Sequence, residues 1–259
     1  MAVVVLGAGG RLGRLLAPRW SAGVRWLSRA DVDVLDAEAV GRALAGASAV
    51  LCMAGVTNGT DRSMALNVTL AQATLDAAAK AQAGRVFLFS SAAVYGAQGG
   101  LLSEQGPTAA VSDYGRAKIE MEKMAAAHPH PATVLRLGNV AGADAILDRW
   151  RPGFALDTFE DGTTPKRSYI GPGMLANALR ALAAQQDLPG VLNLCAPGCV
   201  EMGALLDAAG LAWARRPATD ATIAEVWLDT RALEAIIEFT PADRTPAGIV
   251  ADWQRGLDT

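Results

Sequence analysis

Three segments of the sequence hold residue types that could carry out one reaction together. They are a glycine-rich turn at residues 7–13, a serine pair at residues 90–91, and a tyrosine and a lysine four residues apart, Tyr114 and Lys118. A phenol beside an ammonium can exchange a proton, and a serine hydroxyl can bind the oxygen of an alcohol or a carbonyl. A glycine-rich turn can bind the phosphates of a nucleotide. Each segment alone is a weak signal, but in this order they predict a nicotinamide-dependent enzyme that moves hydride on and off a carbon bearing a hydroxyl.

The tyrosine and the lysine share one face if their segment is helical, because residues four apart lie one turn from each other. The pKa of a free tyrosine is about 10. An ammonium about 4 Å away favours the phenolate by up to ~4 kcal/mol, or about three pKa units. We therefore expect Lys118 to lower the pKa of Tyr114 to about 7 and to hold the ribose hydroxyls of a cofactor. Ser91 is expected to orient the reacting carbon. For Ser90 and Tyr95 the simpler interpretations are turn capping and packing.

The glycine-rich turn follows an apolar run and opens a helical pattern. Gly7 permits a tight turn, Gly10 lets the backbone approach a pyrophosphate, and Gly13 lets the helix pack close to the strand. The start of the helix supplies free N–H groups for the phosphates. The turn, with Arg11 and Leu12 between its glycines, therefore predicts a dinucleotide-binding site.

The end of the second strand predicts which dinucleotide binds. Sites for NAD usually place Asp or Glu there, on the ribose 2′-hydroxyl, whereas this strand ends with Leu27, Ser28 and Arg29. Arg29 can bind a 2′-phosphate through two parallel hydrogen bonds, and Arg11 can add a second positive charge. We therefore expect NADP(H) to be favoured over NAD(H). The alternative for Arg29 is a solvated surface charge.

Apolar runs alternate with helical patterns along most of the chain, which predicts an α/β fold built on a Rossmann-type doubly wound parallel sheet. The expected strands span residues 3–6, 23–27, 33–35, 49–54, 86–90, 132–137 and 191–194. The expected helices span residues 11–20, 37–44, 63–81, 112–127 and 174–184.

The pattern loosens after residue 142, which suggests a second part of the molecule. We expect residues 1–142 to form the dinucleotide-binding core, to which residues 171–195 return. Residues 143–170 look rich in loops, and residues 196–259 hold two short helical stretches around a strand-like segment at 224–228. These two segments are expected to form a small C-terminal substrate-binding cap over the carboxyl ends of the strands.

Composition excludes several other classes of protein. The 259 residues are 51% hydrophobic, and the net charge of −3 gives no electrostatic reason to expect a nucleic-acid or membrane partner. No apolar run approaches the roughly 20 residues that span a bilayer. The first apolar run leads into the glycine turn, so no signal peptide is expected. Three cysteines fit a cytoplasmic protein, and their spacing predicts no metal site.

Taken together, these motifs resemble the short-chain dehydrogenase/reductase superfamily, in its extended, NAD(P)-dependent epimerase/dehydratase branch. The resemblance covers nearly the whole chain. It is carried by Gly7, Gly10, Gly13 and Asn67, and by segments 33–36, 52–55, 87–96, 114–118, 136–142, 167–170 and 228–231.

The resemblance implies further contacts with the cofactor. Asp33 and Val34 would border the adenine, and Ala54 and Gly55 would approach the ribose. Leu137 stands where the family usually has a proline beside the nicotinamide, so only a backbone contact is expected there.

The resemblance also bears on the substrate. Asn139, Arg167 and Tyr169 match positions that often face it, and in several members of the family it is a nucleotide sugar. Arg167 could bind a phosphate or a carboxylate, or form a structural ion pair. Sugar dehydratases place an acidic pair after the serine or threonine of the active site, whereas this chain has Ala92 and Ala93. Dehydration therefore lacks its acid and base.

These observations leave three hypotheses for function. The first is an NADP-dependent short-chain dehydrogenase/reductase that interconverts an alcohol and a carbonyl on a small polar, sugar-like substrate. The second is an NAD(P)-dependent epimerase of nucleotide sugars. The third is a non-catalytic protein that senses NADP. A homodimer formed through the helix of Tyr114 is a further hypothesis, although burial within one chain explains the same apolar residues.

Overall fold

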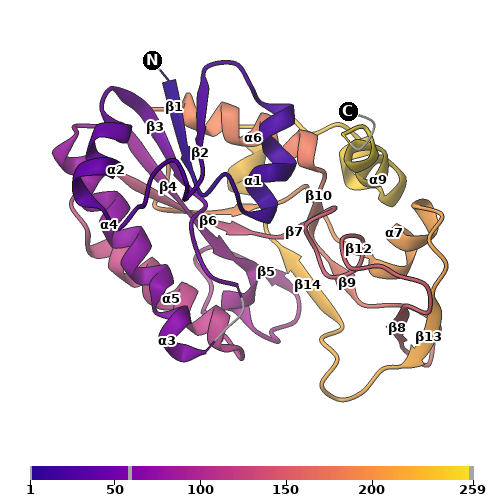
Figure 1. Cartoon of the computed structure of the whole chain (residues 1–259). Helices are drawn as coiled ribbons and strands as arrows, with labels where there is room; N and C mark the ends of the chain where they lie inside the picture. The colour runs from indigo at the N-terminus through magenta and orange to yellow at the C-terminus, as the bar shows by residue number, and fades with distance from the viewer. Residues whose placement is uncertain (1, 58–59, 257–259) are drawn as a thin grey trace.

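A six-stranded parallel sheet is the centre of the computed structural model, which describes residues 2–57 and 60–256 (Figure 1). The strands lie in the order β11-β6-β4-β3-β1-β2, and every neighbouring pair is parallel. Their bounds are β1 Ala2–Leu6, β2 Val24–Leu27, β3 Ala47–Cys52, β4 Arg85–Ser91, β6 Ala132–Leu137 and β11 Val191–Leu194. The predicted doubly wound parallel sheet is thus confirmed.

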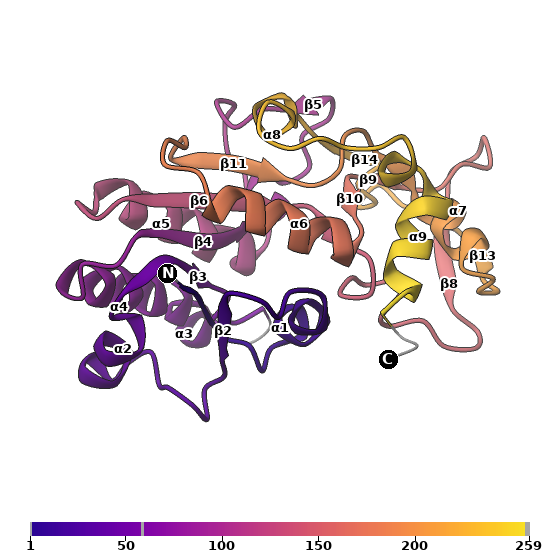
Figure 2. The same cartoon turned by 90° about the horizontal axis from the view of Figure 1, so that it is seen from above.

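Helices cover both faces of the sheet, which explains why its strands are apolar on both sides. Figures 1 and 2 show α2 (Ala37–Leu44), α4 (Leu66–Lys80) and α5 (Asp113–Ala127) on one face, and α1 (Arg11–Leu16) and α6 (Pro172–Ala183) on the other. Successive strand residues alternate between two buried clusters, because side chains of a strand point to opposite faces in turn. Val5, Leu51 and Leu135 pack on the α6 side, and Val4, Val50 and Val134 on the α4 side.

The order of the strands places a switch in chain direction between β1 and β3. After β1 the chain passes through α1 and the 3-10 helix η1 (Ala17–Arg19) to β2 at the edge of the sheet, and then returns through α2 to β3 on the other side of β1. The backbone N–H of Gly7 donates to Leu27 O, and that of Met53 donates to Leu6 O. Open α/β sheets bind ligands outside the carboxyl ends of the strands at such a point.

Small sheets and short helices follow the end of β6. They include the pair β7 (Asn139–Val140) and β10 (Tyr169–Ile170), and the pair β8 (Ala155–Thr158) and β13 (Ala214–Pro217). A further sheet has the order β12-β9-β14-β5, from Val200–Glu201, Lys166–Arg167, Glu225–Leu228 and Leu101–Leu102. Apolar side chains from residues 141–253 form a separate cluster among them. Strands of two to four residues give no periodic pattern, so the sequence predicted only loops over residues 143–170.

The remaining short elements connect these parts. They are α3 (Asp61–Met64), η2 (Ala92–Tyr95), α7 (Met202–Ala208), α8 (Arg231–Glu234) and η3 (Ala242–Arg244). Within the described residues, no helix combines the length and the apolar character that crossing a membrane requires.

One predicted strand is wrong. Residues 33–35 form a turn, in which Asp33 Oδ1 accepts a hydrogen bond from the backbone N–H of Leu35 and Asp33 O accepts one from Asp36. Short polar side chains offer the backbone such local partners in competition with a sheet. Asp36 then caps α2 by accepting from the N–H groups of Glu38 and Ala39.

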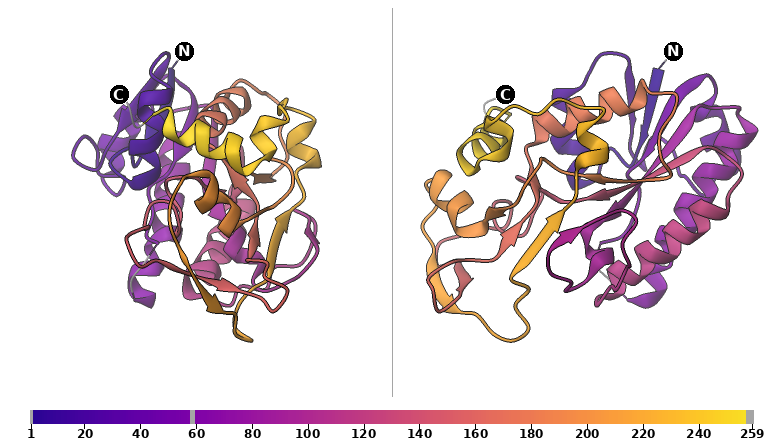
Figure 3. Two further views of the ribbon diagram at one scale, coloured as in Figure 1. Left: turned by 90° about the vertical axis from the view of Figure 1, so that its right-hand side faces the viewer. Right: turned by 180° about the vertical axis from the view of Figure 1, so that it is seen from behind.

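A C-terminal helix, α9 (Pro246–Gln254), was missed by the sequence analysis and lies against α6 (Figure 3). Asp252 Oδ2 accepts from the backbone N–H of Met174 at 3.0 Å, in the first turn of α6. A Cβ at Gly171 or Gly173 would stand 2.2 or 2.3 Å from the Asp252 carboxylate. Gly171, the N-cap residue of α6, has no side chain that could accept a hydrogen bond from the first N–H groups of the helix. The last helix therefore supplies the cap that α6 lacks.

The tail was expected to belong to the cap as a whole, but part of it contacts the main sheet. Leu233, Ile237 and Phe239 are buried in the same cluster as the α6 side of the six strands. The domain boundaries themselves stay a prediction.

We expect Asp252→Ala to destabilise the protein by about 1 kcal/mol, because loss of an N-cap acceptor leaves a helix N–H unsatisfied. The melting temperature should fall by about 2–4 °C for a chain of this size. Calorimetry on Asp252→Ala and on Glu238→Ala, which removes an exposed carboxylate of the same C-terminal segment, measures the difference. Equal melting temperatures for the two variants would contradict the capping role.

Candidate active site

A cleft of about 540 Å³ opens beyond the carboxyl ends of β1, β3, β4 and β6. Its volume is in the range of small-molecule and cofactor sites. It brings together most of the residues predicted for the site, namely Gly7, Gly10, Arg11, Leu12, Gly13, Gly55, Ser91, Tyr114, Lys118, Leu137 and Asn139.

Two glycines of the loop are required by close backbone approaches. Gly7 has φ +87°, and a Cβ there would stand 2.6 Å from Ala54 N. A Cβ at Gly13 would stand 2.4 Å from Ala8 O. Ala54 therefore lies directly against the glycine turn. Gly10 is different. A Cβ there would have Gly7 O, at 3.2 Å, as its nearest neighbour, and Gly10 is exposed and lines the cleft. The absence of a side chain at Gly10 therefore leaves space in the cleft for a ligand and is not needed for packing within the protein.

The loop after β3 forms a further part of the wall of the cleft. A Cβ on Gly55 would meet Asn67 Oδ1 at 2.8 Å and Lys118 Nζ at 3.6 Å. The buried Asn67 amide fixes this loop, because it accepts from Val56 N at 3.2 Å and donates to Val56 O at 3.0 Å. Asn67 also lines the cleft. In the sequence, Asn67 was only one of the residues that carry the family resemblance.

Tyr114 reaches Ser91 because α5 starts close to η2. Ser112 caps α5 by accepting from the N–H of Gly115 at 3.1 Å, and Ser91 caps η2 by accepting from that of Ala93 at 3.2 Å. A Cβ at Gly115 would stand 2.6 Å from Ala93 O, so only glycine permits this approach. The result is a hydrogen bond between the Tyr114 phenol and Ser91.

The expected lowering of the Tyr114 pKa is not found. Burial raises the pKa of Tyr114 above its ordinary value, and the hydrogen bond with Ser91 only opposes this shift. Lys118 Nζ lies 5.7 Å from the centre of the Tyr114 ring and donates instead to Phe89 O at 2.8 Å. Burial lowers the pKa of Lys118 to about 8. The Lys118 ammonium is thus hydrogen-bonded to a backbone carbonyl of β4, whereas the helical spacing predicted an interaction with the Tyr114 phenol.

The predicted readers of the nucleotide lie at the rim, and they are not among the residues lining the cleft. Ser28 borders the glycine loop, since a Cβ on Gly9 would stand 3.4 Å from its Cβ. Ser28 N and Oγ donate to Asp31 Oδ2 at 2.8 and 2.6 Å, which lowers the pKa of Asp31. The side chain of Arg29 is 89% exposed and lies 3.9 Å from Asp33. The carboxylate of Asp31, directly after β2, was missed.

Val34 does not face the cleft either. It is buried in the cluster on the α4 side of the sheet, beside residues of β1 and β3. Asp33 is exposed and makes its own turn, so the expected adenine contacts of these two residues stay predictions.

Two of the residues matched to the substrate, Arg167 and Tyr169, are not among the residues that line the cleft. Tyr169 is 2% exposed and donates to Asp144 Oδ2 at 2.6 Å. Arg167 donates to Lys166 O and Ile223 O at 2.7 and 2.8 Å. Asp144 itself lines the cleft, and burial raises its pKa. No motif surrounds Asp144, so it could not be selected from the sequence.

Two arginines extend the positive charge of the glycine loop. Arg11 donates to Ala143 O at 3.1 Å and lies 3.4 Å from Asp148. Arg14 donates to Gly9 O and lines the cleft, although the sequence analysis did not select it. Arg11 therefore joins the glycine loop to the segment after β7.

Comparison with known proteins identifies the family. A model of the NAD dependent epimerase/dehydratase family matches residues 3–154. The chain belongs to this family. The resemblance seen in the sequence is thereby confirmed. No curated protein sequence matches the chain.

Solved structures of similar fold cover almost the whole chain. The NAD-dependent NDP-hexosamine 5,6-dehydratase TunA of tunicamycin biosynthesis has 22% identity and a TM-score of 0.77 over 100% of this chain and 99% of its own. MoeE5, in complex with UDP-glucuronic acid and NAD, has 22% identity and a TM-score of 0.76 over 99% and 100%. A UDP-glucose-4-epimerase from Stenotrophomonas maltophila, with NAD and formylated UDP-arabinopyranose, has 19% and 0.78 over 100% and 99%. At these identities the likeness establishes the fold alone.

The cleft of this epimerase/dehydratase family member fits a nicotinamide dinucleotide. Gly10 and Gly55 present backbone where a Cβ would stand in or beside the open space. Arg11 and Arg14 bring positive charge to the glycine loop, and Lys118 lines the same cleft beside Gly55. Backbone and arginine donors suit a pyrophosphate, and an ammonium suits ribose hydroxyls.

We expect Gly10→Ala to weaken binding of NADH or NADPH by about tenfold, or about 1.4 kcal/mol. Its methyl group would occupy cleft space while displacing Gly7 O by only a few tenths of an ångström. Gly9→Ala is the matched control, because its Cβ would make an ordinary contact with Ser28 at 3.4 Å. Titration by nicotinamide fluorescence measures both, with melting temperature as the check on folding. Equal loss in the two variants would contradict the assignment of Gly10.

Proposed function

We propose that this protein is an NAD(P)-dependent enzyme that oxidises and re-reduces a hydroxyl-bearing carbon of a nucleotide sugar, as an epimerase. The observation that carries the proposal is the meeting of Ser91, Tyr114 and Lys118 in the same cleft as the glycine loop. Similar structures that were solved with NAD and a UDP-linked ligand support this substrate class. Under this proposal the segments after residue 142 hold the substrate.

Each of the three side chains has a role in this reaction. A bound nicotinamide would take hydride from the carbon and return it. Tyr114 exchanges the proton of the substrate hydroxyl, while Ser91 hydrogen-bonds the same oxygen. Lys118 holds ribose hydroxyls through its Nζ, which lies beside Gly55. Because burial raises the pKa of Tyr114, the phenol is protonated at neutral pH and can protonate a carbonyl oxygen. Removal of the hydroxyl proton should become faster as the pH rises.

Epimerisation is favoured over dehydration by the residues that follow Ser91. Ala92 and Ala93 begin η2, where a dehydratase would need an acid and a base. Asn139 and Asp144 are the polar side chains that line the cleft beyond Leu137. They can bind sugar hydroxyls without supplying that pair.

A net oxidoreductase on a small polar substrate is the second candidate, and the exposed Arg29 after β2 favours it, because NADP(H) serves net reduction. The two candidates differ in the absorbance of the nicotinamide. An epimerase gives no net change over many turnovers, whereas an oxidoreductase consumes one cofactor per turnover.

We expect Tyr114→Phe to lower kcat by about 10²–10⁴-fold, because the reaction loses its proton carrier. Affinity for NADH should stay unchanged, since the glycine loop is untouched. Conversion of UDP-glucose, UDP-N-acetylglucosamine and UDP-glucuronic acid, followed by chromatography with added NAD or NADP, supplies the assay. Full turnover by Tyr114→Phe on any substrate that the wild-type protein converts would refute the mechanism.

For the cofactor we propose that Arg29 favours NADP(H), although MoeE5 and the Stenotrophomonas epimerase were solved with NAD and TunA is described as NAD-dependent. The carboxylate of Asp31, which accepts hydrogen bonds from Ser28, stays ionised and opposes a 2′-phosphate. Arg29, 89% exposed and 3.9 Å from Asp33, would have to outweigh this repulsion by turning toward the phosphate. We expect Arg29→Ala to weaken NADPH binding by about tenfold or more, because a hydrogen bond to a charged group contributes about 1.5–3 kcal/mol.

NADH binding should be nearly unchanged in the same variant. Arg42→Ala is the matched control, since Arg42 is an exposed arginine of α2 paired only across one turn with Glu38. Equal affinity of the wild-type protein for NADH and NADPH would contradict the proposed preference for NADP(H).

A further inference from the structure

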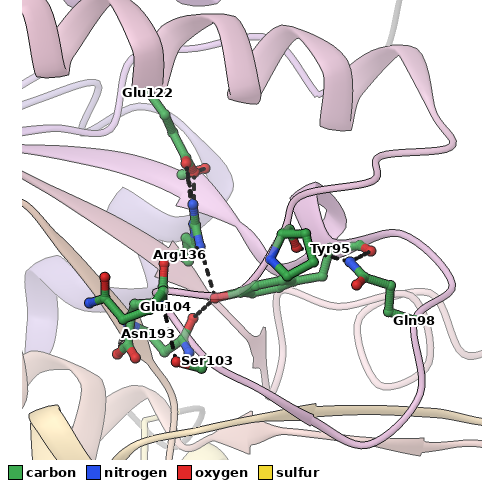
Figure 4. Close-up of polar contacts among 10 residues, drawn as sticks. Tyr95, Gln98, Ser103, Glu104, Glu122, Arg136 and Asn193 are labelled. Carbon is green, nitrogen blue, oxygen red and sulfur yellow. Dashed lines mark hydrogen bonds and ion pairs between the residues drawn. The ribbon is translucent and has the colours of Figure 1, made fainter.

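A buried ion pair lies directly behind the cleft (Figure 4). Glu122 of α5 and Arg136 of β6 are 9% and 5% exposed. Arg136 Nη2 donates to Glu122 Oε2 at 2.7 Å, and its Nε lies 3.2 Å from both carboxylate oxygens. Neither side chain lines the cleft. In the sequence, Arg136 belongs to the motif at residues 136–142, and none of the motifs includes Glu122.

Arg136 is held in place by groups other than Glu122. Its Nη1 donates to Tyr95 Oη at 3.0 Å and to Glu104 O at 3.2 Å. Tyr95 in turn donates to Asn193 Oδ1 of β11 at 2.8 Å (Figure 4). The guanidinium is therefore fixed to β6, η2 and β11 and offers Glu122 a rigid partner.

Glu122 joins this framework to the strand that carries Ser91. Its Oε1 accepts from Ser90 Oγ at 2.5 Å. Ser90 stands opposite Arg136 in the pairing of β4 with β6, and Ser91 stands opposite Leu137. One carboxylate thus contacts the carboxyl ends of two neighbouring strands. Ser90 itself lines the cleft, and Arg136 directly precedes Leu137, which also lines it.

Glu122 also stands in line with the reacting groups of α5. It follows Lys118 by one turn and Tyr114 by two, so the three lie on one face of the helix. Lys118 donates to Phe89 O, and Glu122 binds the next residue of β4, Ser90. Two consecutive positions of the strand therefore fasten two consecutive turns of the helix.

The buried pair is better explained by geometry than by stability. Replacing a buried ion pair by apolar residues of similar size is often neutral or stabilising, because two charges must be desolvated. Such a pair does fix the register of the elements that carry it, since a shifted helix would leave a buried charge without its partner.

We propose that Glu122 is a positioning residue, which through Ser90 and Arg136 sets α5 against β4 and β6 so that Tyr114 and Lys118 meet Ser91. The proposal rests on the proposed function for its kinetic part. Glu122 acts through its neighbours and touches neither substrate nor cofactor.

The charge of Glu122 also reaches Lys118. The titratable groups that act on this ammonium are Cys52 of β3 and Glu122 of its own helix, and both oppose the effect of burial, which brings the pKa of Lys118 to about 8. The phenol of Tyr114 faces Lys118 through its ring. Glu122 itself is faced by Arg136 and Ser90. Without the carboxylate, Lys118 should lose its proton at a lower pH, and ribose binding should weaken there.

The test compares three variants of the full-length protein by NADH affinity between about pH 6 and pH 9.5 and by kcat and KM on the substrate that the wild-type protein converts. Glu122→Gln keeps the shape and removes the charge. Ser90→Ala removes the hydrogen bond and keeps the ion pair. Glu120→Gln is the matched control, because Glu120 is an exposed carboxylate of the same helix paired with Lys123 at 2.8 Å.

In the wild-type protein, affinity for NADH should fall as the pH rises through about 8, where Lys118 is neutralised. Glu122→Gln should move this inflection down by about half a pH unit or more and lower kcat by about tenfold or more, with KM nearly unchanged. Ser90→Ala should lower kcat by a smaller factor and leave the inflection in place. Glu120→Gln should behave as the wild type.

Glu122→Gln with the wild-type inflection and kcat would overturn the proposal, even if its melting temperature fell. If Glu122→Gln does not fold, Ser90→Ala decides, and wild-type kcat in that variant overturns it. If no substrate is converted by any variant, the proposed function has failed, while the inflection of NADH binding still tests Glu122. A shift of the inflection then supports its action on Lys118, and an unchanged inflection overturns it.

Discussion

The attachment of α5 to the carboxyl end of β4 is the constraint on which the rest of the cleft depends. Lys118 binds Phe89 O, and Glu122 binds Ser90 Oγ together with Arg136. These contacts combine an ammonium, a carboxylate and a guanidinium away from water, where a mismatch is costly because no solvent replaces a lost partner. A rotation or a one-residue slide of α5 would break all of them together. The helix therefore has one position, and Tyr114 is placed beside Ser91 as a consequence.

Glycines, which have no side chain, shape the cleft as much as the side chains that line it. Gly7 lies against Ala54, Gly115 against Ala93, and Gly55 against Asn67, each closer than a Cβ would allow. The first two approaches are between backbones, so no repacking of a flexible side chain could relieve the clash. They bring the turn after β1, the loop after β3 and the start of α5 to one point. The switch in strand order makes this convergence possible, because β1 and β3 are neighbours whose chains leave in opposite directions.

The sequence predicts helices and strands well where a buried face requires apolar residues at regular spacing. It predicts a structural feature poorly where that feature depends on a single contact between distant residues. Apolar runs and the glycine spacing indicated the six strands and the dinucleotide turn. Helical spacing placed Tyr114 and Lys118 on one face, but could not show that the ammonium binds a carbonyl 29 residues earlier. The capping of α6 by Asp252 joins residues 78 apart, and Asp144 enters the cleft from a segment without periodicity. Such contacts exist only once the chain has folded, so no local pattern records them.

The protonation states of the site impose a direction on its chemistry. Burial raises the pKa of Tyr114 and brings that of Lys118 to about 8, so at neutral pH the free protein holds a neutral phenol and a cation. This arrangement suits protonation of a carbonyl oxygen. Withdrawal of a hydroxyl proton first requires the phenol to lose its own, which burial opposes. An oxidised, positively charged nicotinamide held in this cleft would favour the phenolate of Tyr114, and a reduced, neutral one would favour the phenol again. A cofactor that changes charge within the cycle therefore suits a tyrosine that must both take and return a proton, and this requirement is stricter for an epimerase than for a one-way reductase.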